Sequence, residues 1–376
     1  MSKGKKLYSG EYMIQPQFDS IAEKIVSKCV NISRGDCVFI LARRDTADFA
    51  ESIGIACIRH GAHPVIQSRS DDFRRQSVLQ ADHETLAASP RHFLSLLKET
   101  DVFFQVGFLL ETPGYLKDIP PEKFAAQARG HQQIQQIVYD GTKKWIGIAC
   151  PSPGQAAAFQ IPWESYHDTM WKALDTDYDA LIQRCTLVEQ ALYGGKEVHI
   201  TTRKGTDILI HIEDAPLLHD NGVICEPGEG VPLLNLPSGE VYLIPRTAHG
   251  TVIYDYGFLQ GTPIIDLRGE FQDGVVEFKE AESGFDTFME AFQNTKGDIN
   301  KVAELGIGVN PYMTVYGNVI ATEKMNGTVH LAIGDNRPIG GTNTAGGHWD
   351  MFICEPTVTV DGRKILSQGR FLIEGL

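Results

Sequence analysis

Residues 37–41 read Cys-Val-Phe-Ile-Leu, a continuous apolar run typical of a strand that is covered on both faces. The residues that follow it predict a helix from Thr46 to His60, with Asp45 as its cap and Gly61 at its end. Further strands are expected at 64–67, 101–106 and 145–149, and further helices near 91–98 and at about 121–136. This alternation of strand and helix predicts an α/β fold with a mostly parallel sheet.

The turn after the first strand argues against a dinucleotide site. It reads Ala-Arg-Arg-Asp-Thr at residues 42–46 and contains no glycine, whereas a dinucleotide-binding turn requires glycines for close approach to the pyrophosphate. We therefore expect the first half of the chain to shape a cleft or to close over a substrate.

The pattern changes at Gly194-Gly195, where a long helix predicted from Trp163 to Tyr193 ends. We expect an N-terminal parallel-sheet α/β domain at 1–194 and a β-rich α+β, metal-binding and catalytic C-terminal domain at 195–376. Alternating patterns predict its strands, and Lys204-Gly205 and Asp361-Gly362 are hairpin signals. The strands are expected at 197–202, 207–212, 250–254, 274–278, 328–333 and 356–360, and helices at 285–292 and 299–304.

Charge and cysteine usage narrow the class of protein. The net charge of −14 argues against nucleic-acid and anionic-membrane partners, which need a basic face. The basic N-terminus is followed by no apolar stretch, so we expect no signal peptide, and the apolar run around 102–110 is too short to span a bilayer. None of the seven cysteines has the spacing of a zinc or redox pair, which favours a reducing, cytoplasmic location.

Five potential metal ligands crowd into the last third of the chain, each in a short segment of turns and small residues. They are Glu240, Glu304, His330, His348 and Asp350. This mixed nitrogen and oxygen set suits Zn, Co, Mn or Fe. Because five ligands exceed what one catalytic zinc needs, the set predicts two divalent metals that share a carboxylate.

Each ligand also has a simpler interpretation when it is taken alone. His348 and Asp350 would point to one face of a strand, but an isolated His-x-Asp triplet is also explained by chance or by a surface ion pair. His330 could be a hydrogen-bonded structural histidine, and Glu240 and Glu304 could be surface or helix-end glutamates. The combination of segments favours the metal site.

Two further acidic residues flank His330. Glu323 is our candidate general base, because a two-metal hydrolase needs a carboxylate to move a proton from water to the leaving amine. The alternative is that Glu323 and Lys324 form a solvated turn. Asp335 is a polar group that could serve beside the metals.

Four motifs in order resemble the thermophilic metalloaminopeptidase family typified by aminopeptidase T and aminopeptidase S. They are Leu-Pro-Ser-Gly-Glu at 236–240, Glu-Leu-Gly-Ile-Gly at 304–308, Thr-Val-His-Leu-Ala-Ile-Gly at 328–334 and His-Trp-Asp at 348–350. The resemblance implies a two-domain protein, a homodimer, and two divalent cations held by the matching residues around a water that attacks an N-terminal peptide bond.

The sequence departs from this family at one position and one interval. Arg337 stands seven residues after His330, where the family peptidases often carry a tyrosine, and the interval from His330 to His348 is short. Both differences bear on peptide specificity.

A second branch of the fold resembles 2,5-dihydroxypyridine dioxygenases, which use one Fe(II). These enzymes have a histidine where Glu304 stands and lack the glutamate at the position of Glu240. Retention of Glu240, Glu304 and His330 favours the hydrolase.

We therefore expect a cytoplasmic two-metal hydrolase that removes N-terminal residues from peptides or cleaves a related small amide. The metals would be Zn, Co or Mn, with Glu304 or Asp350 bridging them, and the substrate a small peptide or other small molecule. The alternatives are a mononuclear Fe(II) ring-cleavage dioxygenase and a binding protein without chemistry, the latter favoured if the purified chain held no metal.

Overall fold

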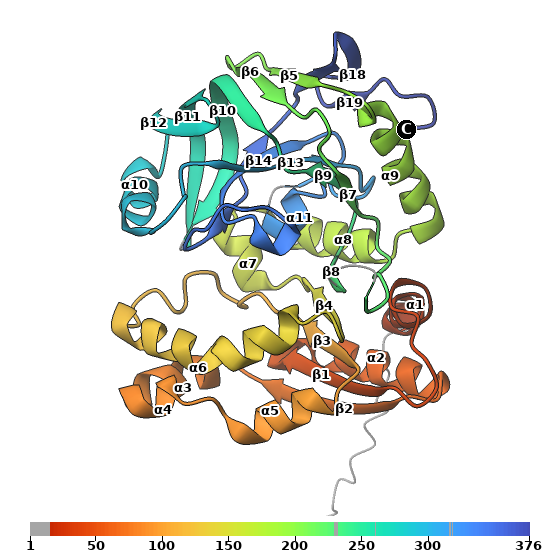
Figure 1. Cartoon of the computed structure of the whole chain (residues 1–376). Coiled ribbons are helices and arrows are strands. Elements are labelled where there is room, and N and C mark those ends of the chain that lie inside the picture. Colours follow the sequence, from red (N-terminus) through yellow and green to blue (C-terminus); the bar gives the residue numbers. More distant parts are fainter. Residues whose placement is uncertain (1–15, 229–231, 260, 316, 318) are drawn as a thin grey trace, which may run out of the picture.

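A five-stranded parallel sheet, sheet A, forms the core of the lower lobe in Figure 1. The computed structural model describes residues 16–228, 232–259, 261–315, 317 and 319–376. The strand order is β2-β1-β3-β4-β8. The strands are β1 (Cys37–Arg43), β2 (His63–Arg69), β3 (Val102–Val106), β4 (Lys144–Ile148) and β8 (Leu233–Leu236). The predicted α/β fold with a parallel sheet is confirmed.

Helices cover both faces of sheet A, because its central strands are apolar on both sides. Even-numbered residues such as Val38, Ile40 and Phe104 share a core with α1 and α2, whereas odd-numbered residues such as Phe39 and Phe103 pack on α5 and α6. The helices of this lobe are α1 (Pro16–Lys24), α2 (Ala47–Arg59), α3 (Asp71–Gln80), α4 (His83–Ala87), α5 (Arg91–Lys98) and α6 (Pro121–Tyr139).

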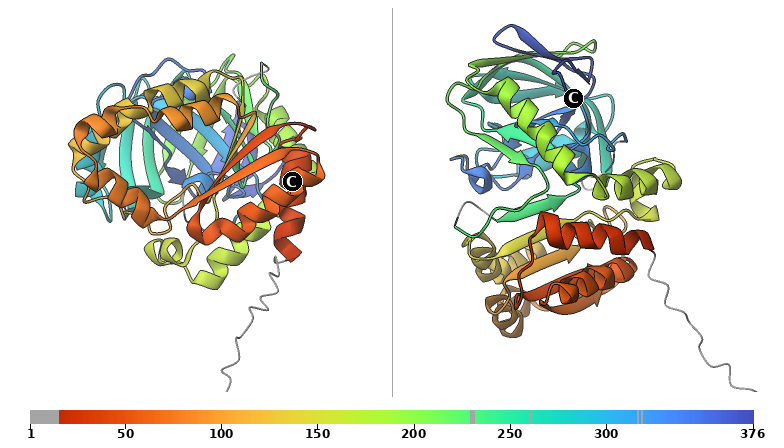
Figure 2. Two further views of the ribbon diagram at one scale, coloured as in Figure 1. Left: turned by 90° about the horizontal axis from the view of Figure 1, so that it is seen from below. Right: turned by 90° about the vertical axis from the view of Figure 1, so that its right-hand side faces the viewer.

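Sheet B, a mostly antiparallel sheet of 14 strands, fills the upper lobe, which Figure 2 shows stacked on the lower one. Its main path runs β19-β18-β17-β5-β6-β10-β16-β14-β13-β9-β7. The strands are β5 (Glu197–Thr201), β6 (Asp207–His211), β7 (Leu217–Asp220), β9 (Glu240–Leu243), β10 (Thr247–Leu259), β11 (Thr262–Gln272), β12 (Val275–Glu280), β13 (Val302–Gly308), β14 (Val329–Gly334), β15 (His348–Trp349), β16 (Phe352–Ile353), β17 (Thr357–Val360), β18 (Arg363–Ser367) and β19 (Arg370–Phe371).

The two predicted hairpins are confirmed. Strands β5 and β6 pair around the turn with Gly205, whose φ is 111°, and β17 pairs with β18 around Asp361 and Gly362. Both of the latter residues have positive φ, 47° and 82°, as a two-residue type I′ turn requires.

One strand of sheet A comes from beyond the predicted boundary. Strand β8 follows β7 of sheet B in the chain, yet it pairs in parallel with β4 at the edge of sheet A. The division into domains at 1–194 and 195–376 stays a prediction. Strand β8 belongs to the second of these ranges in sequence but to the lower lobe in space.

The predicted helix from Trp163 to Tyr193 is wrong in one respect, since it is two helices. Helix α8 (Trp163–Leu174) ends before α9 (Tyr178–Leu192). Between them Asp177 accepts hydrogen bonds from the backbone N–H groups of Asp179 and Ala180, the cap that starts a new helix. The remaining helices are α7 (Pro153–Ala158), α10 (Phe285–Asn294) and α11 (Val319–Thr322).

The predicted helix at 299–304 is also wrong, because these residues lead into strand β13. Every residue of β13 is buried between β9 and β14, so its apolar side chains serve a strand that is covered on both faces.

The predicted cap of the helix at 46–60, Asp45, is wrong as well. The carboxylate of Asp45 binds the guanidinium of Arg43 instead, and α2 begins without a side-chain cap. In the described residues, no helix is long and apolar enough to cross a membrane.

Candidate metal centre

Three neighbouring strands of sheet B place Glu240, Glu304 and His330 on one face. Glu304, Gly306 and Gly308 share a face of β13, because alternate residues of a strand point the same way. His330 of β14 lies opposite Gly306, and Glu240 of β9 lies opposite Gly308. Since residues paired across antiparallel strands project from the same face, the register gathers all three side chains.

The glycines of β13 are needed for this packing. A Cβ atom on Gly306 would lie 2.1 Å from Cε1 of His330, and one on Gly308 would lie 2.2 Å from the carbonyl oxygen of Met325. The imidazole therefore occupies the space that a side chain at Gly306 would fill, which explains the Leu-Gly-Ile-Gly pattern after Glu304.

His348 and Asp350 join the same face from the next strand. His348 lies opposite Gly334 of β14, and its Nε2 is 3.1 Å from Oδ1 of Asp350. Trp349, between them, packs on Phe288 and Phe292 of α10. The alternation expected for a His-x-Asp segment on a strand is thus present.

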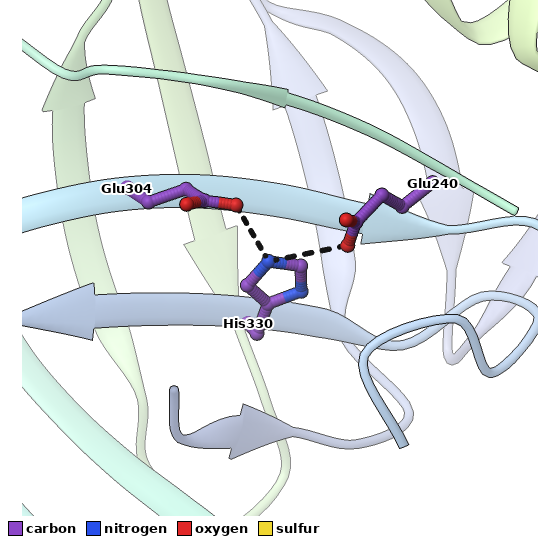
Figure 3. A group of neighbouring side chains, drawn as sticks. All are labelled: Glu240, Glu304 and His330. Atoms are coloured by element: carbon purple, nitrogen blue, oxygen red, sulfur yellow. Dashed lines mark hydrogen bonds and ion pairs between the residues drawn. The ribbon is translucent and has the colours of Figure 1, made fainter. Parts of the chain in front are cut away.

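The five side chains form two groups that share Glu304. Each group is a set of three ligand atoms within 4.8 Å of one another: Glu240, Glu304 and His330 in one, and Glu304, His348 and Asp350 in the other. Figure 3 shows the first group, in which Nε2 of His330 is 3.2 Å from Oε1 of Glu304 and 3.5 Å from Oε2 of Glu240. In the second, Nε2 of His348 is 3.4 Å from Oε2 of Glu304. The two oxygens of one carboxylate therefore face the two imidazoles.

Exposure falls from one end of this cluster to the other. The side chain of His348 is 29% exposed, that of Asp350 12% and that of His330 1%. Solvent therefore reaches the His348 group, and the His330 group is the closed, buried end of the cluster.

A buried lysine completes the closed end. The ammonium of Lys324 is 2.9 Å from Oε1 of Glu323 and 3.0 Å from Oδ2 of Asp220, and it also donates to Oε1 of Glu240. The Glu323–Lys324 segment is therefore no solvated turn: both residues are buried. One ammonium between three carboxylates balances part of their charge.

These carboxylates and imidazoles shift one another's pKa values. Burial raises the pKa of Glu240 to about 7 against the opposing effect of Lys324, and burial raises that of Glu323 well above its usual range. Burial alone would lower the pKa of His330, but Glu304 and Glu240 raise it to about 9. For His348, the nearby Asp350 overcomes burial and raises the pKa to about 10. The pKa of Asp350, which burial would raise, is lowered to about 2 by His348.

Asp335 acts on the centre through its backbone. Its carbonyl oxygen is 2.7 Å from Nδ1 of His348, which orients the ring and leaves Nε2 toward the carboxylates. Its carboxylate binds the guanidinium of Arg337, the residue at the tyrosine position, whose side chain is 57% exposed. Arg337 is thus held beside the segment that positions His348.

His249, which lies just past Glu240 in the sequence, is not among these residues. Its Nε2 is 3.3 Å from Oδ1 of Asp273, and its side chain is 41% exposed. It stacks edge-on to His211 on a different part of sheet B.

Sequence reasoning missed Asp220 and gave Lys324 no role. The one available signal was the Glu323-Lys324 doublet between Thr322 and Met325, which also fits a surface turn.

The arrangement fits divalent cations. Oε2 of Glu240, which faces Nε2 of His330, is buried and has no hydrogen-bond partner in the described part of the chain. Carboxylates that crowd together in a buried site repel one another, and a cation bound among them relieves both costs. The mixed imidazole and carboxylate donors suit borderline ions of the Zn, Co and Mn type.

The loss of Lys324 is expected to destabilise the metal-free chain. Lys324→Met should lower the free energy of unfolding by ~3–5 kcal/mol, because it leaves three buried carboxylates without their counter-charge. Added Zn should recover part of this loss. Urea titrations with and without Zn measure both effects. Lys279→Met is the matched control, because Lys279 pairs with Glu277 at the surface, and it should change the value by less than about 1 kcal/mol. Equal stability of Lys324→Met and the parent chain would contradict the assigned role.

Comparison with known proteins supplies the family. The sequence model of the thermophilic metalloprotease (M29) family matches residues 14–373. Aminopeptidase AmpS of Bacillus subtilis (strain 168) is 23% identical over 356 residues, which cover 85% of this chain and 84% of AmpS.

Two solved structures share the fold. Wild-type AmpT from Thermus thermophilus superposes with a TM-score of 0.79 at 20% identity, over 95% of this chain and 99% of that one. The 2,5-dihydroxypyridine dioxygenase from Pseudomonas putida KT2440 superposes with a TM-score of 0.61 at 15% identity, over 95% and 98%. At these identities the likeness concerns the fold alone.

Proposed function

The chain belongs to the thermophilic metalloprotease family (M29) and is a metal-dependent aminopeptidase, and from this premise we propose that it uses two divalent ions to remove N-terminal residues from peptides. The residues proposed to hold the ions are Glu240, Glu304, His330, His348 and Asp350. Zn, Co or Mn would suit them.

The observation that carries this proposal is the shared carboxylate of Glu304. Its two oxygens face His330 and His348 separately, at 3.2 and 3.4 Å. A carboxylate can bridge two cations, whereas an imidazole in its place would bind one. The second group contains one imidazole and two carboxylates, which differs from the two-histidine, one-carboxylate set of mononuclear iron oxygenases.

When bound, the ions supply a water of lowered pKa and polarise the scissile carbonyl. The chain contributes positioning and proton transfer. Glu323 is the proposed general base, because its buried carboxylate shares the ammonium of Lys324 with the proposed ligand Glu240, and burial raises its pKa well above the usual range, which makes it a stronger proton acceptor. Lys324, 2.9 Å away, holds its carboxylate in place.

The charge of the centre suits two divalent ions. Carboxylates outnumber the ammonium group there, with Glu240, Glu304, Glu323, Asp350 and Asp220 around Lys324. Two divalent ions beside neutral imidazoles would balance this excess of negative charge.

We also propose a cytoplasmic homodimer. The location is supported by the cysteines, none of which forms a disulfide in the described residues. The dimer is supported by exposed apolar side chains on β2, the edge strand of sheet A, and on the helices next to it in the chain, where another copy could cover them. These side chains are Val65 and Ile66 of β2, Ile58 of α2 and Phe73 of α3.

Metal analysis combined with an amino-acid p-nitroanilide panel tests this function. The purified chain should hold two ions and release p-nitroaniline. His348→Ala should lose the more exposed ion and the activity while the circular dichroism spectrum is kept, because the other group of ligands stays complete. His249→Ala, outside the centre, should retain both ions and full turnover. Undiminished turnover in His348→Ala would mean that His348 is not a ligand.

Metal affinity is expected to rise with pH. With pKa values of about 9 and 10, both imidazoles are protonated in the metal-free chain at neutral pH, and the protons must leave before the nitrogens can bind. For each proton that the metal displaces, the apparent metal affinity rises by about tenfold per pH unit at pH values below the pKa of that imidazole. Zn competition against a chromogenic chelator between about pH 6 and pH 8 measures the slope. A metal affinity that does not change with pH would contradict the assignment of protonated imidazoles. In His348→Ala the slope should correspond to one fewer proton released on metal binding.

A further inference from the structure

A row of amide side chains crosses the face of sheet A that packs on α5 and α6. Gln67 of β2 and Gln105 of β3 both pair with Leu41 of β1, and Gly147 of β4 pairs with Gln105 and with Asn235 of β8. These five positions therefore form one line across the sheet. They lie near the carboxyl ends of their parallel strands, where open α/β sheets bind ligands.

The next row toward the amino ends is apolar. Phe103 pairs with Trp145, and their ring centroids are 4.5 Å apart. Phe93 and Leu96 of α5 and Ile134 of α6 pack on the same cluster. The face thus has an aromatic floor beside a polar line.

A cavity of about 610 Å³ lies between these two rows and the helices. Its size falls in the range of pockets for small organic ligands. Gly147 keeps it open at the polar line, because a Cβ there would lie 2.9 Å from Oδ1 of Asn235 and 3.1 Å from the ring of Phe108. None of the five proposed metal ligands lines it.

The amide side chains of this cavity are accessible and have no hydrogen-bond partner in the described residues. Gln67 is exposed, and Gln105 and Asn235 are half-buried, so their amides can bind a ligand. The guanidinium of Arg69, the last residue of β2, likewise forms no ion pair with any described residue. Burial and the nearby Arg74 lower its pKa, and the carboxylate of Asp71 opposes this shift only in part.

The lining residues include no aspartate or glutamate. His131 of α6, also at the cavity, has its pKa lowered by burial and by Arg69. A guanidinium that has no ion-pair partner among the described residues, beside an aromatic floor, is complementary to an anion with an apolar body.

We propose that this cavity is a second binding site, which takes a small carboxylate with an apolar, ring-sized body. The carboxylate binds Arg69, the amide row completes its hydrogen bonds, and the ring packs on Phe103 and Trp145. Such a group occurs in a free arylalkanoic acid and at the C-terminal end of a peptide with an apolar last residue.

Calorimetric titration of the full metal-loaded chain with 3-phenylpropionate tests the site. One equivalent should bind, whereas 3-phenylpropylamine, with the same body and the opposite charge, should not. Arg69→Gln should weaken binding by about tenfold or more, and Gln105→Met by a few-fold. Arg59→Gln is the control, because Arg59 is an exposed arginine of α2 on the other face of sheet A and should leave binding unchanged.

Titration of the chain after its metals have been removed with a chelator distinguishes this site from the metal centre. Affinity for 3-phenylpropionate that is unchanged after chelation supports the cavity, and loss of binding on chelation places the acid on the metals and overturns the proposal. Equal affinity in Arg69→Gln and the parent overturns it too. To distinguish the sources, a peptide with a C-terminal phenylalanine and its C-terminal amide are compared as competitors. Displacement by the acid alone identifies the peptide end as a ligand, and displacement by neither identifies the free acid.

Discussion

Glu304→Gln is expected to lower kcat/KM for an amino-acid p-nitroanilide by about 1,000-fold or more and to leave the chain without its normal complement of metal. The neutral amide removes the one charge that both groups of ligands share, and cation binding of this kind supplies several kcal/mol of transition-state stabilisation. His348→Ala, by comparison, disturbs one group only.

The measurement is kinetics together with metal content after gel filtration. Glu277→Gln is the matched control, because Glu277 is a glutamate on β12 whose side chain is 78% exposed and pairs with Lys279 at the surface. It should keep both ions and full activity. A Glu304→Gln chain that retains two ions would show that another carboxylate, such as Asp350, is the bridge.

Oxygen-free reconstitution is expected to restore activity in full. Chelation should remove all measurable turnover, and Co, Zn or Mn added under argon should restore the release of p-nitroaniline, because hydrolysis consumes water and no oxidant. The expected change is the complete loss and recovery of turnover. Titration of the metal against activity should reach its plateau at two ions per chain.

The same experiment addresses the fold that the chain shares with the dioxygenase. Activity that appears only with Fe(II), air and a hydroxylated aromatic ring would contradict the hydrolase and make Glu304 a ligand of a modified iron site. Fe(II) that supports peptide hydrolysis under argon would leave the reaction class unchanged and alter only the identity of the metal.

Part of the site could be predicted because its signals are local. Glycines at 306 and 308, the His-x-Asp spacing at 348–350 and the turn before Glu240 are each visible within a few residues. The role of Lys324 could not be predicted in this way. Its three partners, Glu323, Glu240 and Asp220, are 1, 84 and 104 residues away in the chain, and only the neighbouring one is apparent in the sequence.

The misassigned segments show the same limit. Residues 299–304 have no strict alternation, because β13 is buried on both faces and has a register shift between Val302 and Glu304 against β14. Such a segment cannot be distinguished from a short buried helix by periodicity. The break between α8 and α9 depends on a capping aspartate, Asp177, within an otherwise continuous helical pattern.

The sequence by itself determined the parallel sheet of the first half, the strand-rich second half and the five candidate ligands, because each depends on side-chain period, turn residues or short spacing. Only the tertiary structure decided that β8 crosses to sheet A, that β9, β13, β14 and β15 bring the ligands to one face, and that Lys324 closes the site. These features depend on pairing between distant strands. Pairing is selected by burial of the whole sheet, a free energy that no single segment contains.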